Sequence, residues 1–147
     1  MKNLFFVLLL CSAFGAQAKD VASPKLNRFV LPVGNGTVVV AEGENEPRSI
    51  GSYSIRLYGG QKAKFPFDEF LAGQIFPRNG TIEQVLSSDV DENGVNEVLV
   101  VTRSAGTGSF LSVDVFSWQN AQLSRLLTLA DIAANADPVL SVKNMVR

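Results

Sequence analysis

The stretch EVLVVTRSAGTGSFLSVDVFSW, residues 97–118, contains two β-like runs separated by small residues. The first run, 97–103, is apolar at successive positions, which is typical of a strand covered on both faces. In the second run, 110–118, apolar and polar residues alternate, as they do in a half-buried strand. A tight hairpin needs only about two turn residues. The longer connection, Ser104–Phe110, therefore suggests a purpose beyond reversing the chain.

The rest of the chain also reads as short strands. Further β-like runs cover 28–33, 37–41, 52–58 and 123–129. Gly34-Asn35-Gly36 joins the first two runs, and Asn-Gly between apolar runs is the strongest short signal for a hairpin. Asn79-Gly80 predicts a second turn, and 131–136 predicts one short helical turn. This pattern predicts an all-β, single-domain protein, either an antiparallel β-sandwich or a barrel.

The N-terminus has the pattern of a cleaved secretory signal peptide. Lys2 precedes an apolar run, Leu4–Leu10, and Ala16-Gln17-Ala18 is a small-x-small cleavage site. The apolar run is too short to cross a bilayer as a helix. We therefore expect residues 1–18 to be removed on export, and residues 19–147 to form one extracytoplasmic domain.

Composition narrows the classes of function. The net charge of −1 favours neither nucleic acid nor an anionic membrane as a partner. The chain has no histidine, and its single cysteine, Cys11, lies in the expected signal peptide. Without histidine, the usual general base, the usual metal ligand and a Ser-His-Asp triad are all missing. We expect a binding protein without a cofactor rather than an enzyme.

One acidic loop raises a calcium alternative. Asp89, Asp91, Asn93 and Glu97 place oxygen ligands at spacings that can wrap Ca²⁺, with Gly94 at the bend. The loop is not an EF-hand, because its twelfth position is a valine. A polar turn leading into a strand explains the same residues. The alternative function is a calcium-dependent extracytoplasmic binding module that uses the Asp89–Glu97 loop.

A carboxylate hydrolase is a second alternative. Glycoside hydrolysis needs two carboxylates at a fixed separation across a cleft. The candidate acids are Glu42, Glu44, Glu46, Asp68 and Glu69. They lie at expected strand ends and are typical of solvated loops.

The Ser104–Phe110 loop is suited to entering a cleft of another protein. Its glycines keep the backbone thin, its hydroxyl groups can donate or accept hydrogen bonds, and its phenylalanine offers an apolar anchor at the base. The candidate binding residues are Ser104, Gly106, Thr107, Gly108, Ser109 and Phe110. A flexible hairpin loop without a partner explains the same composition.

Two longer stretches resemble a known family. AEGENEPRSIGSYSIRLY, residues 41–58, and DVDENGVNEVLVVTRSAGTGSFLSVDVFSW, residues 89–118, together with the signal peptide, resemble the periplasmic inhibitors of invertebrate-type (I-type) lysozyme. The resemblance implies an eight-stranded antiparallel β-sandwich, a periplasmic location, homodimerisation and an I-type lysozyme as partner. In the first of these stretches, Arg48, Tyr53 and Arg56 are expected to shape a supporting loop or the dimer, without a catalytic role.

The resemblance also implies an inhibitory loop. Related lysozyme inhibitors share a Ser-Gly-x-Tyr-like motif that enters the lysozyme active-site cleft. Its match here is Thr107-Gly108-Ser109-Phe110. Threonine in place of serine keeps the hydroxyl group, whereas phenylalanine in place of tyrosine loses one.

Overall fold

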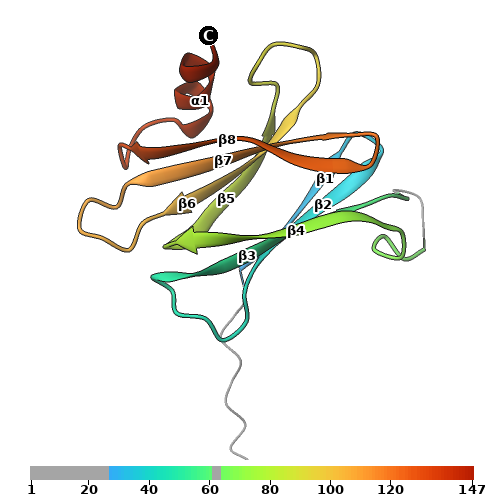
Figure 1. Cartoon of the computed structure of the whole chain (residues 1–147), viewed down its shortest axis with the longest axis horizontal. Helices are drawn as coiled ribbons and strands as arrows, with labels where there is room; N and C mark the ends of the chain where they lie inside the picture. The colour runs from blue at the N-terminus through green and yellow to red at the C-terminus, as the bar shows by residue number, and fades with distance from the viewer. Residues whose placement is uncertain (1–26, 61–63) are drawn as a thin grey trace, which may run out of the picture.

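The computed structural model describes residues 27–60 and 64–147, which form two four-stranded antiparallel sheets (Figure 1). The expected signal peptide lies outside the described residues. Sheet A contains, in order, β1 (Arg28–Val33), β2 (Gly36–Glu42), β3 (Ile50–Tyr58) and β4 (Phe70–Asn79). Sheet B contains β5 (Thr81–Ser88), β6 (Glu97–Arg103), β7 (Leu111–Gln119) and β8 (Gln122–Ile132), and helix α1 (Pro138–Val146) follows. The predicted antiparallel β-sandwich is confirmed.

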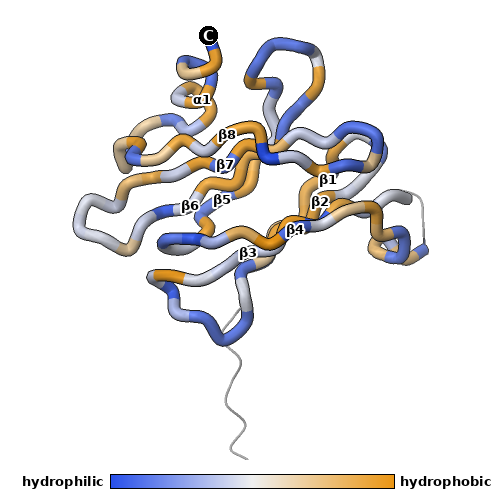
Figure 2. Tube along the Cα trace, viewed as in Figure 1, coloured by the Kyte–Doolittle hydropathy of each residue, from blue (hydrophilic) through white to orange (hydrophobic). Residues whose placement is uncertain are grey.

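Strand β6 is covered on both faces, as its apolar run predicts. Val98, Leu99, Val100 and Val101 are each 0% exposed. Val98 and Val100 belong to the core between the sheets, whereas Leu99 and Val101 belong to a second core on the outer side of sheet B. Helix α1 covers that second core with the buried Val142 (Figure 1). Figure 2 shows the hydrophobic residues concentrated along the strands.

The two Asn-Gly pairs have different roles. The first closes the predicted hairpin, since Val33 pairs with Gly36 where β1 meets β2. The second, Asn79-Gly80, connects β4 to β5, which lie in different sheets, so it carries the chain across the sandwich. Gly80 adopts a φ of 109°, which favours glycine, and its N–H donates to the Ser49 carbonyl at 2.9 Å.

The helix differs from expectation, and two strands, β4 and β5, lie where the sequence pattern predicts none. The helical turn predicted at 131–136 is wrong, because β8 extends to Ile132 and the helix begins at Pro138. Asp137 caps this helix by accepting two backbone N–H groups, and proline suits the first helical position. Strand β4 contains Pro77, which is tolerated because β4 is an edge strand of sheet A. Among the described residues, no helix has the length and hydropathy needed to cross a bilayer.

Candidate functional site

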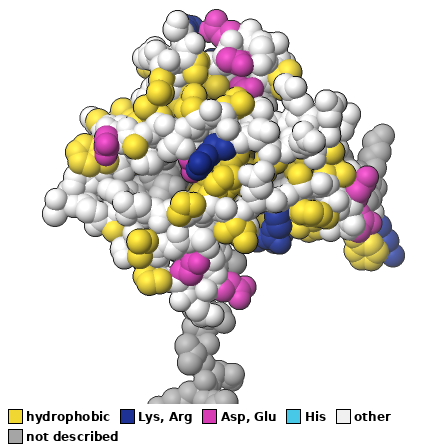
Figure 3. Space-filling view, viewed as in Figure 1, with side chains coloured by type: hydrophobic (Ala, Val, Ile, Leu, Met, Phe, Trp, Pro, Cys, Tyr) yellow, Lys and Arg dark blue, Asp and Glu magenta, His cyan; other side chains and the backbone are white. Residues whose placement is uncertain are grey.

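The loop between β6 and β7 is a closed, ordered turn at one end of the sandwich. The Ser104 N–H donates to the Phe110 carbonyl at 2.9 Å, and the Ser109 N–H donates to the Gly106 carbonyl at 3.0 Å. Ser109 adopts a left-handed φ of 47°. Residues 105–108 at the tip are exposed. Figure 3 shows this projecting end as largely white, the colour of backbone and uncharged polar side chains.

Phe110 lies on the exposed side of the loop rather than at a buried base. Strand β7 begins at Leu111, one residue later than the sequence pattern indicates, and Phe110 is 48% exposed. Its ring lies against Gly108, where a Cβ atom would collide with the ring. The apolar anchor predicted at the base of the loop is therefore partly exposed. Glycine at position 108 allows the ring to pack on the loop backbone and present its other face to solvent.

Arg103, the last residue of β6, anchors the backbone of the loop by hydrogen bonds. Its Nη1 donates to the Ser109 carbonyl at 2.9 Å, and both terminal nitrogens lie 3.3 Å from the Ala134 carbonyl. Its guanidinium also pairs with the Glu83 carboxylate on β5. The hydrogen bond from Arg103 lowers the pKa of Glu83 below its ordinary value. No motif in the sequence singles out this arginine, whose only signal is a charge at the end of an apolar strand.

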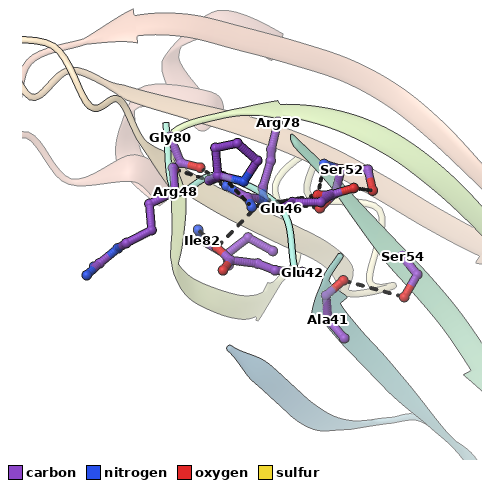
Figure 4. Close-up of polar contacts among 10 residues, drawn as sticks. Ala41, Glu42, Glu46, Arg48, Ser52, Ser54, Arg78, Gly80 and Ile82 are labelled. Atoms are coloured by element: carbon purple, nitrogen blue, oxygen red, sulfur yellow. Dashed lines mark hydrogen bonds and ion pairs between the residues drawn. The ribbon is translucent and has the colours of Figure 1, made fainter. Parts of the chain in front are cut away.

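A second loop, residues 43–49 between β2 and β3, is organised by Arg78 of β4 (Figure 4). The Arg78 side chain is 2% exposed and lies 4.0 Å from the Glu42 carboxylate and 3.7 Å from that of Glu46. Its guanidinium donates to the backbone carbonyls of Pro47, Arg48, Ser52 and Gly80. One buried cation therefore satisfies carbonyl groups from three segments of the chain.

The carboxylates around Arg78 are themselves hydrogen-bonded. Glu42 accepts from the Ile82 N–H at 2.7 Å, and Glu46 accepts from both the N–H and the hydroxyl of Ser52. The hydrogen bond from the Ser52 N–H lowers the pKa of Glu46. These acids therefore have structural partners and are not poised for catalysis.

Gly80 brings the two loops together. Its N–H bonds Ser49 of the 43–49 loop, and a Cβ atom on Gly80 would fall on the carbonyl of Arg103, the residue that precedes the 104–110 loop. Figure 1 shows both loops projecting from the same end of the sandwich. In Figure 4 the Arg48 side chain points away from the Arg78 cluster. The site thus combines the uncharged 104–110 loop with the neighbouring 43–49 loop, which carries the exposed side chains of Glu44 and Arg48.

The other candidate acids do not form a catalytic pair. Asp68 and Glu69 precede the first residue of β4, whereas Glu42 and Glu46 contact Arg78 near its last. A strand of this length spans roughly 30 Å at about 3.3 Å per residue. Catalytic carboxylates of glycosidases lie within about 10 Å of each other. The arrangement of these acids does not support hydrolysis.

The acidic loop 89–97 lies at the other end of β6 from the 104–110 loop. Ligand atoms of Asp89, Asp91 and Glu97 lie within 4.8 Å of one another. Asp89 accepts from the N–H groups of Asn93 and Gly94 at 3.1 and 2.8 Å, and Asp91 accepts from the Asn93 side chain at 2.8 Å. The buried Glu97 accepts from the Val90 N–H at 2.9 Å. These contacts are those of a self-satisfied polar turn.

Tyr53 and Arg56 of β3 lie away from the 104–110 loop. Tyr53 points into the core and donates its hydroxyl to Asp114 of sheet B at 2.6 Å. Arg56 lies on the opposite, outer face of sheet A, because neighbouring strand residues alternate between faces. Neither residue reaches the 104–110 loop.

The family model and the solved structures that match this chain all belong to one protein family. The family model described as "Periplasmic lysozyme inhibitor of I-type lysozyme" matches residues 25–146. The crystal structure of the periplasmic lysozyme inhibitor of I-type lysozyme from Aeromonas hydrophila is similar, at 36% identity and a TM-score of 0.70, over 80% of this chain and 98% of that one. The A. hydrophila inhibitor in complex with Meretrix lusoria lysozyme is similar at 36% identity and a TM-score of 0.72, over 80% and 95% of the two chains. No curated protein matches.

Proposed function

Because this chain belongs to the family of periplasmic inhibitors of I-type lysozyme, we propose that it binds an I-type lysozyme and blocks hydrolysis of peptidoglycan. The observation that carries the proposal is the closed, uncharged loop 104–110, which projects from a rigid sandwich and presents hydroxyl groups and one exposed ring. A similar protein forms a complex with Meretrix lusoria lysozyme.

The loop has the chemistry to occupy a glycosidase cleft. Such clefts carry two carboxyl groups and accept sugar hydroxyls. In the proposed complex, the hydroxyl groups of Ser104 and Thr107 donate to these carboxylates, which makes charge-assisted hydrogen bonds. Gly106 keeps the tip narrow, and the exposed face of Phe110 covers apolar surface at the cleft wall. Inhibition is then steric occlusion combined with competition for the catalytic acids.

The neighbouring loop extends the proposed contact surface. Arg48 points away from the cluster that anchors its backbone, so its guanidinium is available to a partner beside the 104–110 loop. Lysozyme clefts are acidic at the reacting centre, and a cation at the rim favours encounter with such a surface. Arg48 therefore adds to the association rate rather than to occlusion.

We extend the proposal to location and assembly. Residues 1–18 direct export and are removed, and residues 19–147 act in the periplasm as a homodimer, without catalysis or a cofactor. Support for the location comes from the small-x-small pattern at residues 16–18 and from the periplasmic family.

Titration of the mature protein into I-type, vertebrate-type and goose-type lysozymes tests the proposal, with lysis of cell walls as the readout. We expect stoichiometric inhibition of the I-type enzyme. Thr107→Ala should weaken inhibition, whereas Ser124→Ala, an exposed hydroxyl on β8, is the matched control and should have no effect. Absence of inhibition by the unmodified protein would refute the function. Full inhibition after replacement of Gly106, Thr107, Gly108 and Phe110 together would refute only the loop assignment.

A further inference from the structure

A small hollow, called here the Trp118 hollow, lies at the end of the sandwich opposite the 104–110 loop. It has a volume of about 280 Å³ and is lined by Val33, Gly34, Gly94, Val95, Asn96 and Trp118. These residues come from the β1–β2 hairpin, the end of the β5–β6 loop and the end of β7. Figure 1 shows the β1–β2 and β7–β8 turns side by side at this end, and a Cβ atom on Gly34 would contact the Trp118 ring. The hollow is therefore separate from the proposed lysozyme contact.

The floor of the Trp118 hollow is apolar and holds one unpaired hydrogen-bond donor. Val33 is 4% exposed, and both Val33 and Trp118 pack in the core between the sheets. The Nε1 atom of Trp118 is buried and has no acceptor among residues 27–60 and 64–147. A Cβ atom on Gly34 would lie 3.0 Å from Cζ2 of the indole, the ring carbon next to the N–H edge. The N–H edge therefore lies beside the Gly34 wall of the hollow.

The mouth of the hollow is formed by exposed, uncharged groups. Val95 is 45% exposed, and the exposed Asn96 offers a carboxamide that can both donate and accept. A Cβ atom on Gly94 would meet nothing within 4 Å, so the rim is open there. Among the described residues, no charged side chain lines the hollow, and the nearby carboxylates of Asp89 and Asp91 in the same loop disfavour an anion. The site suits a neutral ligand.

These groups match the chemistry of an acetamido group, which has a carbonyl that accepts, an N–H that donates and an apolar methyl group. The Trp118 N–H can donate to the carbonyl, and the Asn96 side-chain oxygen can accept from the N–H. Val33 and Val95 supply apolar surface for the methyl group. An unpaired buried donor is costly, so an acceptor that reaches the indole is stabilising. Sites for small molecules measure roughly 300–1,000 Å³, so this hollow admits one small unit rather than a long chain.

We propose that the Trp118 hollow binds a neutral N-acetylated amino sugar through its acetamido group. The ligand reaches the indole N–H by displacing the exposed 94–96 segment, which forms the outer wall of the hollow. Peptidoglycan strands are built from N-acetylated amino sugars, so the site would hold the protein on the polymer that it protects. The 104–110 loop, at the other end of β6, stays free. Glycan binding at this hollow does not depend on lysozyme inhibition at the opposite end.

The single tryptophan of the chain makes the test direct. Trp118 gives the only indole resonance in a proton–nitrogen correlation spectrum of the mature protein and is the only source of tryptophan fluorescence. Titration with N,N′-diacetylchitobiose should move this resonance downfield and change the fluorescence along the same saturable curve. Cellobiose, which lacks acetamido groups, should change neither signal. N-acetylalanine N′-methylamide, which carries the amide without a sugar, should bind more weakly than the sugar.

Two variants test the individual contacts by ligand-observed NMR. Trp118→Phe keeps an aromatic ring but loses the N–H, and Asn96→Leu loses the carboxamide at an exposed position that tolerates the change. Each should raise the dissociation constant for the sugar about fivefold, the loss expected for one hydrogen bond. Asn144→Leu, at an exposed amide on α1, is the matched control and should bind like the unmodified protein.

The same proteins are assayed for lysozyme inhibition, which separates the two proposals. An indole resonance that the acetylated sugar does not move, or that cellobiose moves equally, would overturn glycan binding here. Unchanged sugar binding by the Asn96→Leu and Trp118→Phe variants would also overturn it, as would stronger binding of N-acetylalanine N′-methylamide than of the sugar. Saturable sugar binding by a protein that inhibits no lysozyme would support this site and refute the proposed function.

Discussion

Gly108 and Phe110 show how single residues shape the proposed inhibitory loop. The absent side chain of Gly108 lets the Phe110 ring lie on the loop backbone, and the ring stays 48% exposed. The ring is thus pre-positioned for contact at little entropic cost, because its packing on the loop already restricts its rotamers. A hydroxyl group at the ring edge is the one feature of the predicted Ser-Gly-x-Tyr-like motif that this residue lacks.

Phe110→Tyr should strengthen inhibition. A phenol at this exposed ring can donate one more hydrogen bond to the lysozyme, worth about 1 kcal/mol or roughly fivefold in the dissociation constant. Isothermal titration against an I-type lysozyme measures the change, and Phe110→Leu, which keeps only apolar area, should bind more weakly than the unmodified protein. Equal affinity of the tyrosine variant would show that the ring edge does not face a partner acceptor.

Glu97 is a buried acid whose environment opposes ionisation. Its exposed fraction is 1%, and burial raises the pKa of its carboxyl above the ordinary value of 4.5. A raised pKa in the folded state means that the stabilising contribution is fully present below pH 4.5 and is lost as pH rises through the folded pKa. Glu97 therefore makes the protein less stable toward neutral pH.

Glu97→Gln should remove this pH dependence. The stability of the variant relative to the unmodified protein is expected to increase between pH 4 and pH 8, measured by urea unfolding. For Glu83→Gln, the stability of the variant relative to the unmodified protein should instead decrease as pH rises. Arg103 lowers the pKa of Glu83, so the stabilising contribution of the Glu83 carboxylate is lost as pH falls. Parallel pH profiles for the Glu97→Gln variant and the unmodified protein would contradict this assignment.

At the scale of elements, β4 connects the two loops through Arg78. The strand supplies a cation that bonds carbonyl groups of the 43–49 loop, and the chain then turns at Gly80 beside the 104–110 loop. The position of one loop relative to the other is therefore set by a strand that belongs to neither. The two loops are expected to act as one rigid surface.

Arg78→Met should destabilise the protein by about 3–5 kcal/mol, because Glu42 and Glu46 and several carbonyl groups lose their partner. The free energy of unfolding by urea and the rate of proteolysis within 43–49 measure the loss. Arg125→Met is the control: its side chain is 42% exposed and pairs with Asp114 at 3.7 Å, so about 0–1 kcal/mol is expected. Similar losses for both variants would show that the Arg78 cluster does not anchor the loop.

At the scale of the whole molecule, the two sheets are joined by more than apolar packing. Tyr53 of sheet A donates its hydroxyl to the Asp114 carboxylate of sheet B at 2.6 Å, and Asp114 also accepts from Thr128. Burial raises the pKa of the Tyr53 phenol, so it remains a donor throughout the physiological range. This bond links the layer that carries the 104–110 loop to the layer that carries the 43–49 loop.

Tyr53→Phe should cost about 1.5–3 kcal/mol, the range for a hydrogen bond to a charged group. Tyr58→Phe is the matched control, because Tyr58 contacts Phe67 and Phe70 through its ring, and a change within about 0.5 kcal/mol is expected. Thermal and chemical unfolding measure both. A loss for Tyr53→Phe no larger than for Tyr58→Phe would mean that the cross-sheet bond is exchanged for water without penalty.

Short-range patterns were enough to predict much of the fold. The apolar run at 98–101 indicates a doubly covered strand, and Gly34-Asn35-Gly36 indicates a hairpin; both are confirmed. The sequence pattern predicts neither β4 nor β5, because Pro77 interrupts β4 and a bulge between Ile82 and Gln84 interrupts the alternation of β5. Helix α1 follows the segment where one helical turn is predicted, and begins after the Asp137 cap. The alternation of apolar and polar residues and the residue types of turns depend on neighbours in the sequence, so both can be recognised without a structure.

The composition of the 104–110 loop was likewise readable from the sequence, but its surroundings were not. Arg78 bonds carbonyl groups as far away as Pro47, and Gly80 touches Arg103 only because the chain crosses from one sheet to the other at this point. A hollow lined by Arg56 and Phe70 likewise depends on Gly73 of the neighbouring strand, where a Cβ atom would approach both side chains to 3.1 Å. Such contacts follow from strand order and register, which are set by the packing of the whole sandwich rather than by any local stretch of the chain.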